Sequence, residues 1–233
     1  MKKIIGITGP SRFTPELRSM VSNFFKAIPL DINQDGKDLN TVLPLCSAII
    51  FGGGVDILPA TYGSEVLNKH HLSKFDRARD ERELYIFDWC NSKSKPVLGI
   101  CRGHQLILAR LGATINMDIS GFGICHNPLN QEIDMDGEPV HFVECDTRHH
   151  TTFFEKELVN SFHHQAVVYN PPDTGYEVIG KSKLVQFPET CDDYIVELAS
   201  GSNFLSCQWH PECDWETNKA SGIVLEKFKQ QIK

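Results

Sequence analysis

Two short segments carry residue types that together form a nucleophilic catalytic site. The first, Gly99-Ile100-Cys101-Arg102-Gly103, has the Gly-x-nucleophile-x-Gly spacing of an elbow at which a strand turns sharply into a helix. The second, Trp209-His210-Pro211-Glu212, places a histidine and a carboxylate two residues apart. Cys101 would be the nucleophile, His210 the general base and acid, and Glu212 the group that orients the imidazole. The two segments predict a Cys-His-Glu site for acyl chemistry.

An acyl-transfer site also needs a thiolate and donors for the oxyanion. A helix that starts after Cys101 brings its N-terminus to the sulfur, which favours the thiolate, as a nearby imidazolium does. Gly52-Gly53-Gly54 follows an apolar segment and can present backbone N–H groups, and the backbone N–H of Arg102 is a second natural donor. We therefore expect an oxyanion hole from Gly53, Gly54 and Arg102.

Each of these segments also has a purely structural interpretation. A cysteine after a strand is commonly buried and inert. A lone His-x-Glu is usually a loop histidine beside an unrelated glutamate, and a glycine triplet alone is a flexible turn. The catalytic interpretation is favoured because the elbow and the His-x-Glu segment occur in one chain and the triplet follows a predicted parallel strand.

The elements that would position these residues alternate between apolar strands and helices. The predicted strands are 3–8, 48–51 and 96–100. One predicted helix has Thr14 as its N-cap, a second covers about 74–92, and the helix after Cys101 continues through Leu106 to near Gly112. Such alternation predicts an α/β fold with a doubly wound, mostly parallel sheet flanked by helices. Ligands bind at the carboxyl ends of such strands, where Cys101 and the glycine triplet both lie.

The remaining chain gives weaker signals. Residues 55–73 read as a loop, and between about 113 and 160 the pattern loosens into short β-like pieces such as 140–145. Further strands are expected at 176–179, 194–198 and 204–208, with a final helix over about 218–231. No internal repeat or linker is found, so we expect one domain over residues 1–233 with a small additional β region.

The composition excludes several classes of partner. The 233-residue chain has 23 basic and 30 acidic residues, a net charge of −7 and no basic run, which argues against nucleic acid. No apolar stretch approaches the roughly 20 residues that span a bilayer. The N-terminal segment lacks the apolar core and cleavage site of a signal peptide. We therefore expect a cytoplasmic protein without a membrane partner.

The cysteines and histidines could be read as disulfides or a metal site. The count of eight cysteines is even, but a chain of this size without a secretion signal is expected to keep reduced thiols. Several candidate zinc ligands lie close in sequence: Cys125, His126, His141, Cys145, His149 and His150. Because there is no CxxC pair and the spacing is irregular, we predict no metal and no cofactor.

Five segments together resemble one known family. The chain is similar to the class I glutamine amidotransferase-like superfamily and, within it, most similar to the γ-glutamyl-γ-aminobutyrate hydrolase-like branch, the peptidase C26 family. The matching pieces occur in the family's order over about residues 50–212: Gly52-Gly53-Gly54-Val55-Asp56-Ile57-Leu58-Pro59 with Tyr62, Asp76-x-x-Arg79-Asp80-x-x-Glu83, Gly99 to Gln105, Asn160-Ser161-Phe162-His163-His164-Gln165, and Gln208 to Glu212. The Cys-Arg-Gly and Asn-Ser-x-His-His-Gln pieces are the more specific to the branch.

The resemblance implies a flavodoxin-like sheet and a catalytic triad of Cys101, His210 and Glu212, with an oxyanion hole from the Gly53 region and the Arg102 amide. It also implies contacts around a γ-glutamyl group from Gln105, His164 and Gln165. Two structural alternatives stay open, since Gln105 could serve packing and the adjacent histidines could form a polar strand edge. The Arg79, Asp80 and Glu83 set is expected to be structural, with a role at the rim of the site as the alternative.

The chain departs from the family on the side that would hold the leaving group. Gly112-Ala113 and Met117-Asp118 stand where the branch has Gly-Gly and Gln-Asp, and Cys191-Asp192-Asp193 replaces an Asp-Gly before the Val-Glu strand. Residues 122–154 are also idiosyncratic. The resemblance therefore predicts the nucleophile but leaves the amine open.

Three functions are compatible with these residues. The first is a free-standing hydrolase that cleaves a small γ-glutamyl amine through a γ-glutamyl thioester, releasing glutamate and an amine. The second is a glutaminase subunit that delivers ammonia to a separate synthase or ligase, which would be its partner. The third is an inactive member kept for binding, against which the complete triad argues. A homodimer stays open.

Overall fold

The computed structural model describes residues 2–33, 38–63, 74–119, 141–147, 150–169, 175–183 and 194–232. A large sheet contains β1 (Ile4–Thr8), β2 (Ile28–Asp31), β3 (Ala48–Phe51), β4 (Val97–Ile100), β6 (His141–Cys145), β7 (Lys156–Val159), β9 (Tyr176–Lys183), β10 (Tyr194–Gly201) and β11 (Phe204–Cys207). A second, two-stranded sheet pairs β5 (Thr114–Asn116) with β8 (Ala166–Tyr169).

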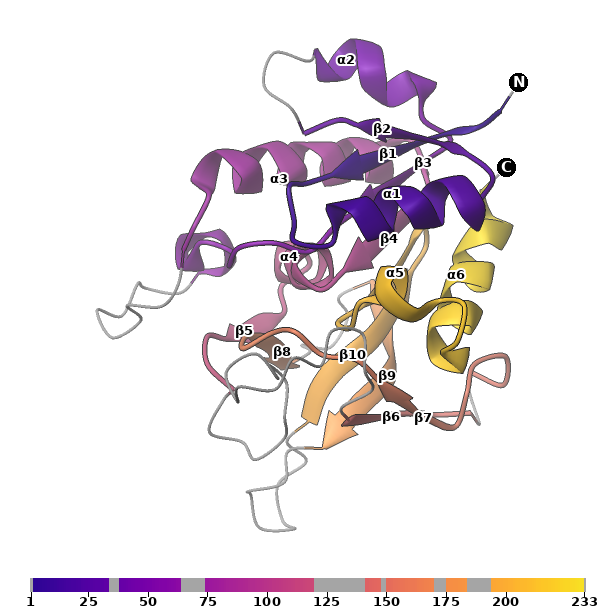
Figure 1. The fold of residues 1–233 in the computed structure, drawn as a ribbon. Coiled ribbons are helices and arrows are strands. Elements are labelled where there is room, and N and C mark those ends of the chain that lie inside the picture. Colours follow the sequence, from indigo (N-terminus) through magenta and orange to yellow (C-terminus); the bar gives the residue numbers. More distant parts are fainter. Residues whose placement is uncertain are drawn as a thin grey trace.

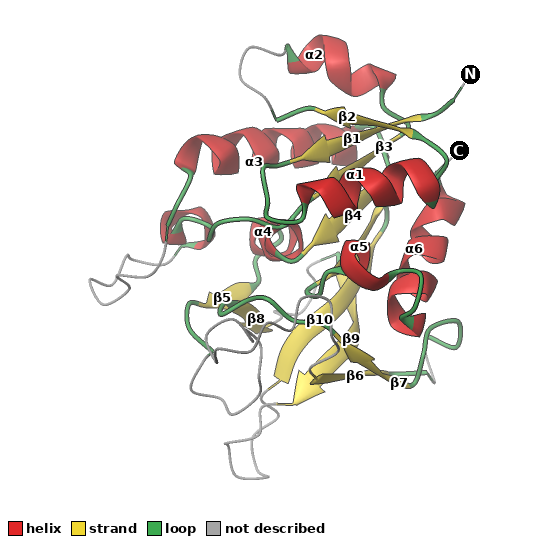
Figure 2. Ribbon diagram, in the orientation of Figure 1, coloured by secondary structure: helices red, strands yellow, loops and turns green. Residues whose placement is uncertain are grey.

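The large sheet has a parallel half and an antiparallel half. Its order is β2-β1-β3-β4-β11-β10-β9-β6-β7, in which every pair from β2 to β11 is parallel and every pair from β11 to β7 is antiparallel. Figure 2 shows the antiparallel strands extending away from β1 and β3. The predicted α/β fold with a parallel core and a small additional β region is confirmed.

Helices cover both faces of the parallel half (Figure 1). They are α1 (Thr14–Asn23), α2 (Leu39–Val42), α3 (Arg77–Ser92), α4 (Arg102–Arg110), α5 (Pro211–Asp214) and α6 (Lys219–Gln231). One apolar cluster joins α1 and α6 to Ile50, Leu98 and Ile100, and another joins α3 and α4 to Ile49 and Phe51. Alternate residues of β3 thus face opposite clusters, as the doubly wound arrangement requires.

The strands that carry the site were predictable because they are buried on both faces. All four residues of β3 and all four of β4 are buried, so each reads in the sequence as a short, continuous apolar run. Parallel pairing places the carboxyl ends of β3, β4 and β11 side by side. The residues that follow these three strands therefore meet at one edge of the sheet.

Three predicted boundaries were wrong by a few residues. Thr14 is the first residue of α1 rather than its N-cap, because its hydroxyl bonds Ser11 at 2.9 Å instead of capping the helix. Helix α3 begins at Arg77, three residues after the predicted start, because Asp76 caps it by accepting a hydrogen bond from the Arg79 N–H. The strand predicted at 204–208 is β11, which ends at Cys207, and Pro211 begins the short helix α5.

Several elements were missed. Strand β2 contains Pro29 and lies at the edge of the sheet, where a missing backbone N–H is tolerated. Strands β5, β7 and β8 have three or four residues each, too few for a clear period. The predicted loop over 55–73 contains a 3-10 helix, Pro59–Tyr62, and residues 64–73 lie outside the described part of the chain.

Candidate active site

Cys101 lies at a sharp turn between β4 and α4. Its backbone angles, φ 51° and ψ −104°, fall in a region that non-glycine residues rarely adopt. A Cβ on Gly99 would come within 2.7 Å of the Ile107 Cδ1 atom. A Cβ on Gly103 would come within 2.3 Å of the Phe51 carbonyl oxygen. The two glycines therefore allow the tight turn, which has the geometry of a nucleophile elbow.

The imidazole of His210 connects Cys101 with Glu212. His210 Nδ1 lies 2.9 Å from Glu212 Oε1, and the ring also hydrogen bonds to the Cys101 side chain. Burial lowers the pKa of His210, but the charges of Glu212 and Cys101 outweigh it and raise that pKa to about 10. The structure thus brings the three predicted triad residues together, with an imidazolium beside the sulfur at neutral pH.

Two phenylalanine rings pack against the His210 imidazole. The Phe13 and Phe162 centroids lie 4.6 and 5.7 Å from that of His210, and 5.1 Å from each other. These contacts help to leave His210 only 3% exposed. Sequence analysis gave neither phenylalanine a role: Phe162 is the variable position of the Asn-Ser-x-His-His-Gln segment, and nothing marked Phe13.

Asn160 holds the backbone of His210 from both directions. Its Oδ1 accepts a hydrogen bond from the His210 N–H, and its Nδ2 donates to the His210 carbonyl oxygen, both at 2.9 Å. Nδ2 also donates to Asp214 Oδ2 at 2.9 Å, and Ser221 Oγ donates to Asp214 Oδ1 at 2.6 Å. The sequence placed Asn160 in a family segment without a role, and gave no signal for Asp214 or Ser221.

The predicted oxyanion donors lie close to Cys101 and His210. A Cβ on Gly53 would come within 2.8 Å of the His210 Cε1 atom, so Gly53 lies directly against the imidazole. Gly54 and Arg102 line the same pocket as Cys101. Arg102 is the first residue of α4, so its backbone N–H has no acceptor within the helix. The arrangement suits an oxyanion hole, and the role itself stays a prediction.

The Arg102 side chain is buried in an ion cluster with three residues of α3. Its guanidinium pairs with Asp80 and Glu83, and Arg79 Nε donates to Glu83 at 2.8 Å. The exposed fractions are 5% for Arg79, 1% for Asp80 and Arg102, and 0% for Glu83. Burial raises the pKa of Glu83, but the two arginines outweigh it and hold that pKa below its usual value.

The sequence predicts a structural role for the charged α3 residues, with a place at the rim of the site as the alternative. Their burial and mutual ion pairs agree with the structural role. Arg79 Nη2 also donates to the Gly53 carbonyl oxygen at 2.8 Å, so the cluster lies directly behind the predicted oxyanion loop.

Cys101 opens into a pocket with a volume of about 220 Å³. The predicted substrate residues Gln105, His164 and Gln165 all line it, together with the charged side chains of Asp56 and Lys74. A pocket with both an acidic residue and basic residues in its wall suits a small zwitterionic ligand.

The three predicted substrate residues differ in what they already bind. Gln105 Nε2 donates to the Gln165 backbone carbonyl at 2.8 Å and to Gln208 Oε1 at 3.1 Å. His164 Nε2 lies 3.0 Å from Asp56 Oδ2, and this hydrogen bond raises the pKa of His164 although burial opposes it. Gln165 is 1% exposed, and neither its side-chain nitrogen nor its oxygen has a partner among the described residues. Gln165 therefore has hydrogen-bonding capacity left for a ligand.

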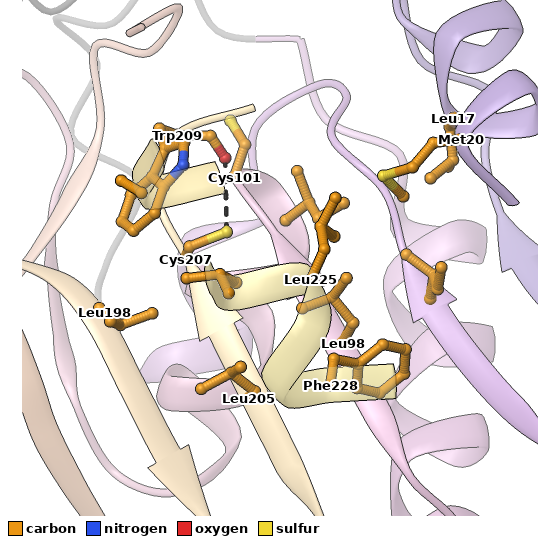
Figure 3. Close-up of a cluster of buried hydrophobic side chains, with 14 of the residues drawn as sticks. Leu17, Met20, Leu98, Cys101, Leu198, Leu205, Cys207, Trp209, Leu225 and Phe228 are labelled. Atoms are coloured by element: carbon orange, nitrogen blue, oxygen red, sulfur yellow. Dashed lines mark hydrogen bonds between the residues drawn. The ribbon is translucent and has the colours of Figure 1, made fainter. Parts of the chain in front are cut away.

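Three other buried cysteines do not share the environment of Cys101. Figure 3 shows Cys207 beside Cys101 at the end of an apolar cluster, with its thiol directed to the Trp209 carbonyl oxygen at 3.7 Å. Burial raises the pKa of Cys207 well above its usual value, and likewise raises the pKa of Cys46 to about 11 and of Cys145 to about 12. These three are therefore protonated thiols at neutral pH rather than thiolates.

The described ranges contain neither a metal-binding cluster nor a membrane-spanning helix. No group of three or more histidine, cysteine or acidic side chains within them could hold a metal ion. Cys125, His126 and His149, from the weighed zinc set, lie outside those ranges. His141 instead bonds Glu197 Oε1 at 2.9 Å. No helix in the same part of the chain is long and apolar enough to cross a bilayer.

Comparison with known proteins gives a family and several relatives. A family model described as Peptidase C26 matches residues 17–212. A provisionally named glutamine amidotransferase-like protein, YvdE, of Lactococcus lactis is 32% identical over 210 residues, which cover 86% of this chain and 79% of the relative. Protein NtpR of Enterococcus hirae is 26% identical over 248 residues, covering all of both chains.

Solved structures share the fold at lower identity. A Thermoplasma acidophilum protein provisionally assigned as one subunit of GMP synthase superimposes with a TM-score of 0.65 at 13% identity, covering 100% of this chain and 94% of the other. A glutamine amidotransferase from Thermotoga maritima gives a TM-score of 0.57 at 16% identity, covering 99% and 84%.

Proposed function

Because the chain belongs to the peptidase C26 family, within the class I glutamine amidotransferase-like superfamily, we propose that it is a cysteine-dependent hydrolase of small γ-glutamyl amines. The proposed products are glutamate and a free amine, and the proposed intermediate is a γ-glutamyl thioester on Cys101. His210 and Glu212 complete the proposed triad, and Gly53, Gly54 and Arg102 supply the proposed oxyanion donors.

The observation that carries the proposal is the unpartnered amide of Gln165 in the pocket of Cys101. A buried amide without partners is costly unless a ligand satisfies both its donor and its acceptor. The α-amino acid end of a γ-glutamyl group offers both, as an ammonium donor and a carboxylate acceptor. Asp56 and Lys74 in the same wall offer the matching charges.

Acylation follows from the protonation states at the site. The Cys101 thiolate attacks the γ-carbonyl carbon, and the carbonyl oxygen becomes an oxyanion held by backbone N–H groups. The tetrahedral intermediate collapses as the C–N bond breaks, and His210 transfers its proton to the leaving amine. The thioester then carries no charge on sulfur.

Deacylation uses the same histidine in the opposite role. Loss of the thiolate removes one of the two charges that raise the pKa of His210, so the neutral imidazole is more accessible than in the free enzyme. His210 takes a proton from water as the water oxygen attacks the thioester carbon. The C–S bond then breaks, glutamate leaves, and the ion pair of Cys101 and His210 is restored.

The test is glutamate release by the purified chain, with a panel of γ-glutamyl amines beside L-glutamine. We expect one γ-glutamyl amine to be turned over well above glutamine, and Cys101→Ala to lose at least about 10³-fold in rate. Activity that survives in Cys101→Ala would contradict the proposed nucleophile. Equal, slow turnover of every compound would contradict the free-standing hydrolase.

A glutaminase subunit is a second candidate, because several relatives carry glutamine amidotransferase names. The same residues would serve, with ammonia as the leaving group and a separate synthase or ligase as the acceptor. This candidate predicts weak glutaminase activity alone and strong stimulation by that partner.

A further inference from the structure

The ion cluster of Arg79, Asp80, Glu83 and Arg102 joins the oxyanion loop, residues 52–54, to the helix that follows the nucleophile. Its two cations and two anions balance within the protein interior. Arg102, one member of the cluster, is the residue that follows Cys101. Arg79, another member, contacts the loop. A buried cluster of this kind is expensive to desolvate, and replacing such groups by apolar residues is often neutral or stabilising.

Arg79 holds the loop by its carbonyl oxygens. Its Nη2 donates to the Gly53 carbonyl at 2.8 Å and more weakly to the Gly52 carbonyl at 3.4 Å. Its Nη1 donates to the Pro10 carbonyl at 2.8 Å, and its Nε donates to Glu83. Glu83 and Pro10 thus fix two of the guanidinium nitrogens, and the third, Nη2, donates to the loop.

The hydrogen bonds from Arg79 to the loop carbonyls determine the direction of the N–H groups in the loop. A trans peptide is planar, with its C=O and N–H directed oppositely. The Gly53 carbonyl is directed at Arg79, so the N–H of Gly54 is directed away from it. The Gly52 carbonyl has the same effect on the N–H of Gly53. Neither N–H donates to another described residue, which leaves both available to a ligand.

The loop and the guanidinium also fit each other closely. Gly54 has φ +149°, and a Cβ there would come within 2.2 Å of Arg79 Nη1. Gly54 itself lines the pocket that contains Cys101. One side of the loop is therefore occupied by Arg79, and the other side faces the pocket.

We infer that Arg79 is a positioning residue that aims the N–H groups of Gly53 and Gly54 at the developing oxyanion. Glu83 fixes Arg79, and Arg102 ties the same carboxylate to the start of α4, so nucleophile and oxyanion donors share one support. The inference rests on the proposed function for the identity of the natural acyl group, but not for the existence of the oxyanion.

The experiment compares two reactions of the same sulfur in Arg79→Lys. Attack of the Cys101 thiolate on p-nitrophenyl acetate forms an S-acetyl thioester, expels p-nitrophenolate and passes through an oxyanion. Alkylation by iodoacetamide forms a C–S bond, expels iodide and develops no oxyanion. We expect acylation to fall by about 10² to 10³-fold, as when an oxyanion donor is lost, with alkylation changed by less than about threefold.

Controls make the comparison specific. Cys101→Ala gives the background from the other cysteines, and Arg110→Lys replaces an arginine whose ion pair with Asp88 is half exposed. If Arg79→Lys fails to fold, the paired change Arg79→Met with Glu83→Gln removes one cation and one anion together, and the same selective loss is expected. Equal losses in both reactions, or no loss in either, would overturn the inference.

The outcome is independent of the natural substrate. A wild-type protein that cleaves no γ-glutamyl amine but shows the selective loss of acylation in the variant would contradict the proposed function and support the positioning role. Normal γ-glutamyl hydrolysis in Arg79→Lys, with unchanged acylation, would contradict only the positioning role.

Discussion

On the nucleophile side of the site, charged side chains pack behind the oxyanion loop, whereas on the base side a neutral amide holds the backbone of His210. Arg79 contacts carbonyl oxygens of the loop, and its charge is balanced within the ion cluster. Asn160 contacts both the N–H and the carbonyl of His210. Among backbone groups, therefore, the Arg79 support bonds only to carbonyls, whereas the Asn160 support bonds to an N–H and a carbonyl.

The difference follows from what each backbone segment presents. The loop turns carbonyl oxygens to its support, and a guanidinium, which only donates, matches them in a fixed fork. His210 presents a donor and an acceptor together, and an amide side chain carries both. The backbone groups to be bonded therefore explain why one support is an arginine and the other an asparagine. The buried arginine also needs acidic residues nearby to balance its charge, and Asp80 and Glu83 provide them.

The largest expected effect comes from the charge of Glu212, the carboxylate beside His210, and it tests whether the base side depends on charge as well as on the neutral amide. Glu212→Gln keeps a hydrogen-bonding side chain beside the His210 ring but removes its charge. We expect kcat/KM for the turned-over substrate to fall by about 10³ to 10⁴-fold, as in other triads that lose this charge. Measured hydrolysis rates of wild type and variant test the expectation.

The pH dependence of the same variant has a defined sign. The charge of Glu212 is among the causes that raise the pKa of His210 to about 10 in the wild type, so its removal lowers that pKa. The His210 proton is then lost at lower pH, so the basic limb of the pH profile of kcat/KM, above which His210 cannot protonate the leaving amine, moves to lower pH. The exposed Glu216→Gln is the matched control, and an unmoved limb in Glu212→Gln would show that charge at Glu212 is unimportant.

A smaller effect is expected from the neutral support. Asn160→Ala removes both hydrogen bonds to the His210 backbone and the one to Asp214. Buried donors and acceptors are left unpaired, so we expect a loss of about 1–3 kcal/mol in the free energy of unfolding and about a tenfold to hundredfold fall in kcat. Because Asn160 does not line the pocket, KM should change little.

The matched control for this change is Asn218→Ala. Asn218 caps α6 by accepting a hydrogen bond from the Ser221 N–H, and it donates to the Leu158 carbonyl at 2.8 Å. It does not line the pocket that contains Cys101. We expect it to lower stability by about 1 kcal/mol with unchanged kcat. If both variants lose stability alike and neither loses kcat, the distinction between positioning and ordinary structural amides breaks down.

The residues of the parallel half could be predicted because each signal is local. A strand buried on both faces is an apolar run, and the elbow is a strand end followed by small residues at fixed spacing. The supports could not be predicted in the same way. Asn160 lies 50 residues from His210 in sequence, and Arg79 lies 26 residues from Gly53, so only the fold brings them together.

In the antiparallel half, the sequence pattern predicts some strands and misses their neighbours. Strand β6 has the alternating burial that a half-exposed strand produces, and it was predicted, whereas β7 pairs with it over four residues and was missed. Short strands of this kind are specified by their neighbours more than by their own sequence. The departures from the family at 191–193 and much of 122–154 fall outside the described residues, so the leaving-group side stays a prediction.

The smallest expected effect on kcat concerns His104, a buried group that belongs to neither support. Its ring bonds Ser206 Oγ and the Val196 carbonyl at 2.9 and 3.0 Å, and burial lowers its pKa to about 4. The unfolded chain, with an ordinary histidine pKa near 6.5, binds the proton more tightly than the folded one. The contribution of His104 to stability is therefore complete above about pH 6.5 and is lost as the pH falls to 4, by about 3 kcal/mol in total.

The change His104→Gln tests this assignment, since glutamine can donate to the Val196 carbonyl but does not titrate. We expect urea unfolding between pH 7 and 4 to show a shallower loss of stability in the variant than in the wild type, while kcat at pH 7.5 changes by less than about threefold. His164→Gln should show the opposite sign, because Asp56 raises the pKa of His164 and that stability is lost as the pH rises. A His104→Gln variant with the wild-type pH slope but a large fall in kcat would place His104 among the groups that position the elbow, and the separation of the site into two supports would then be incomplete.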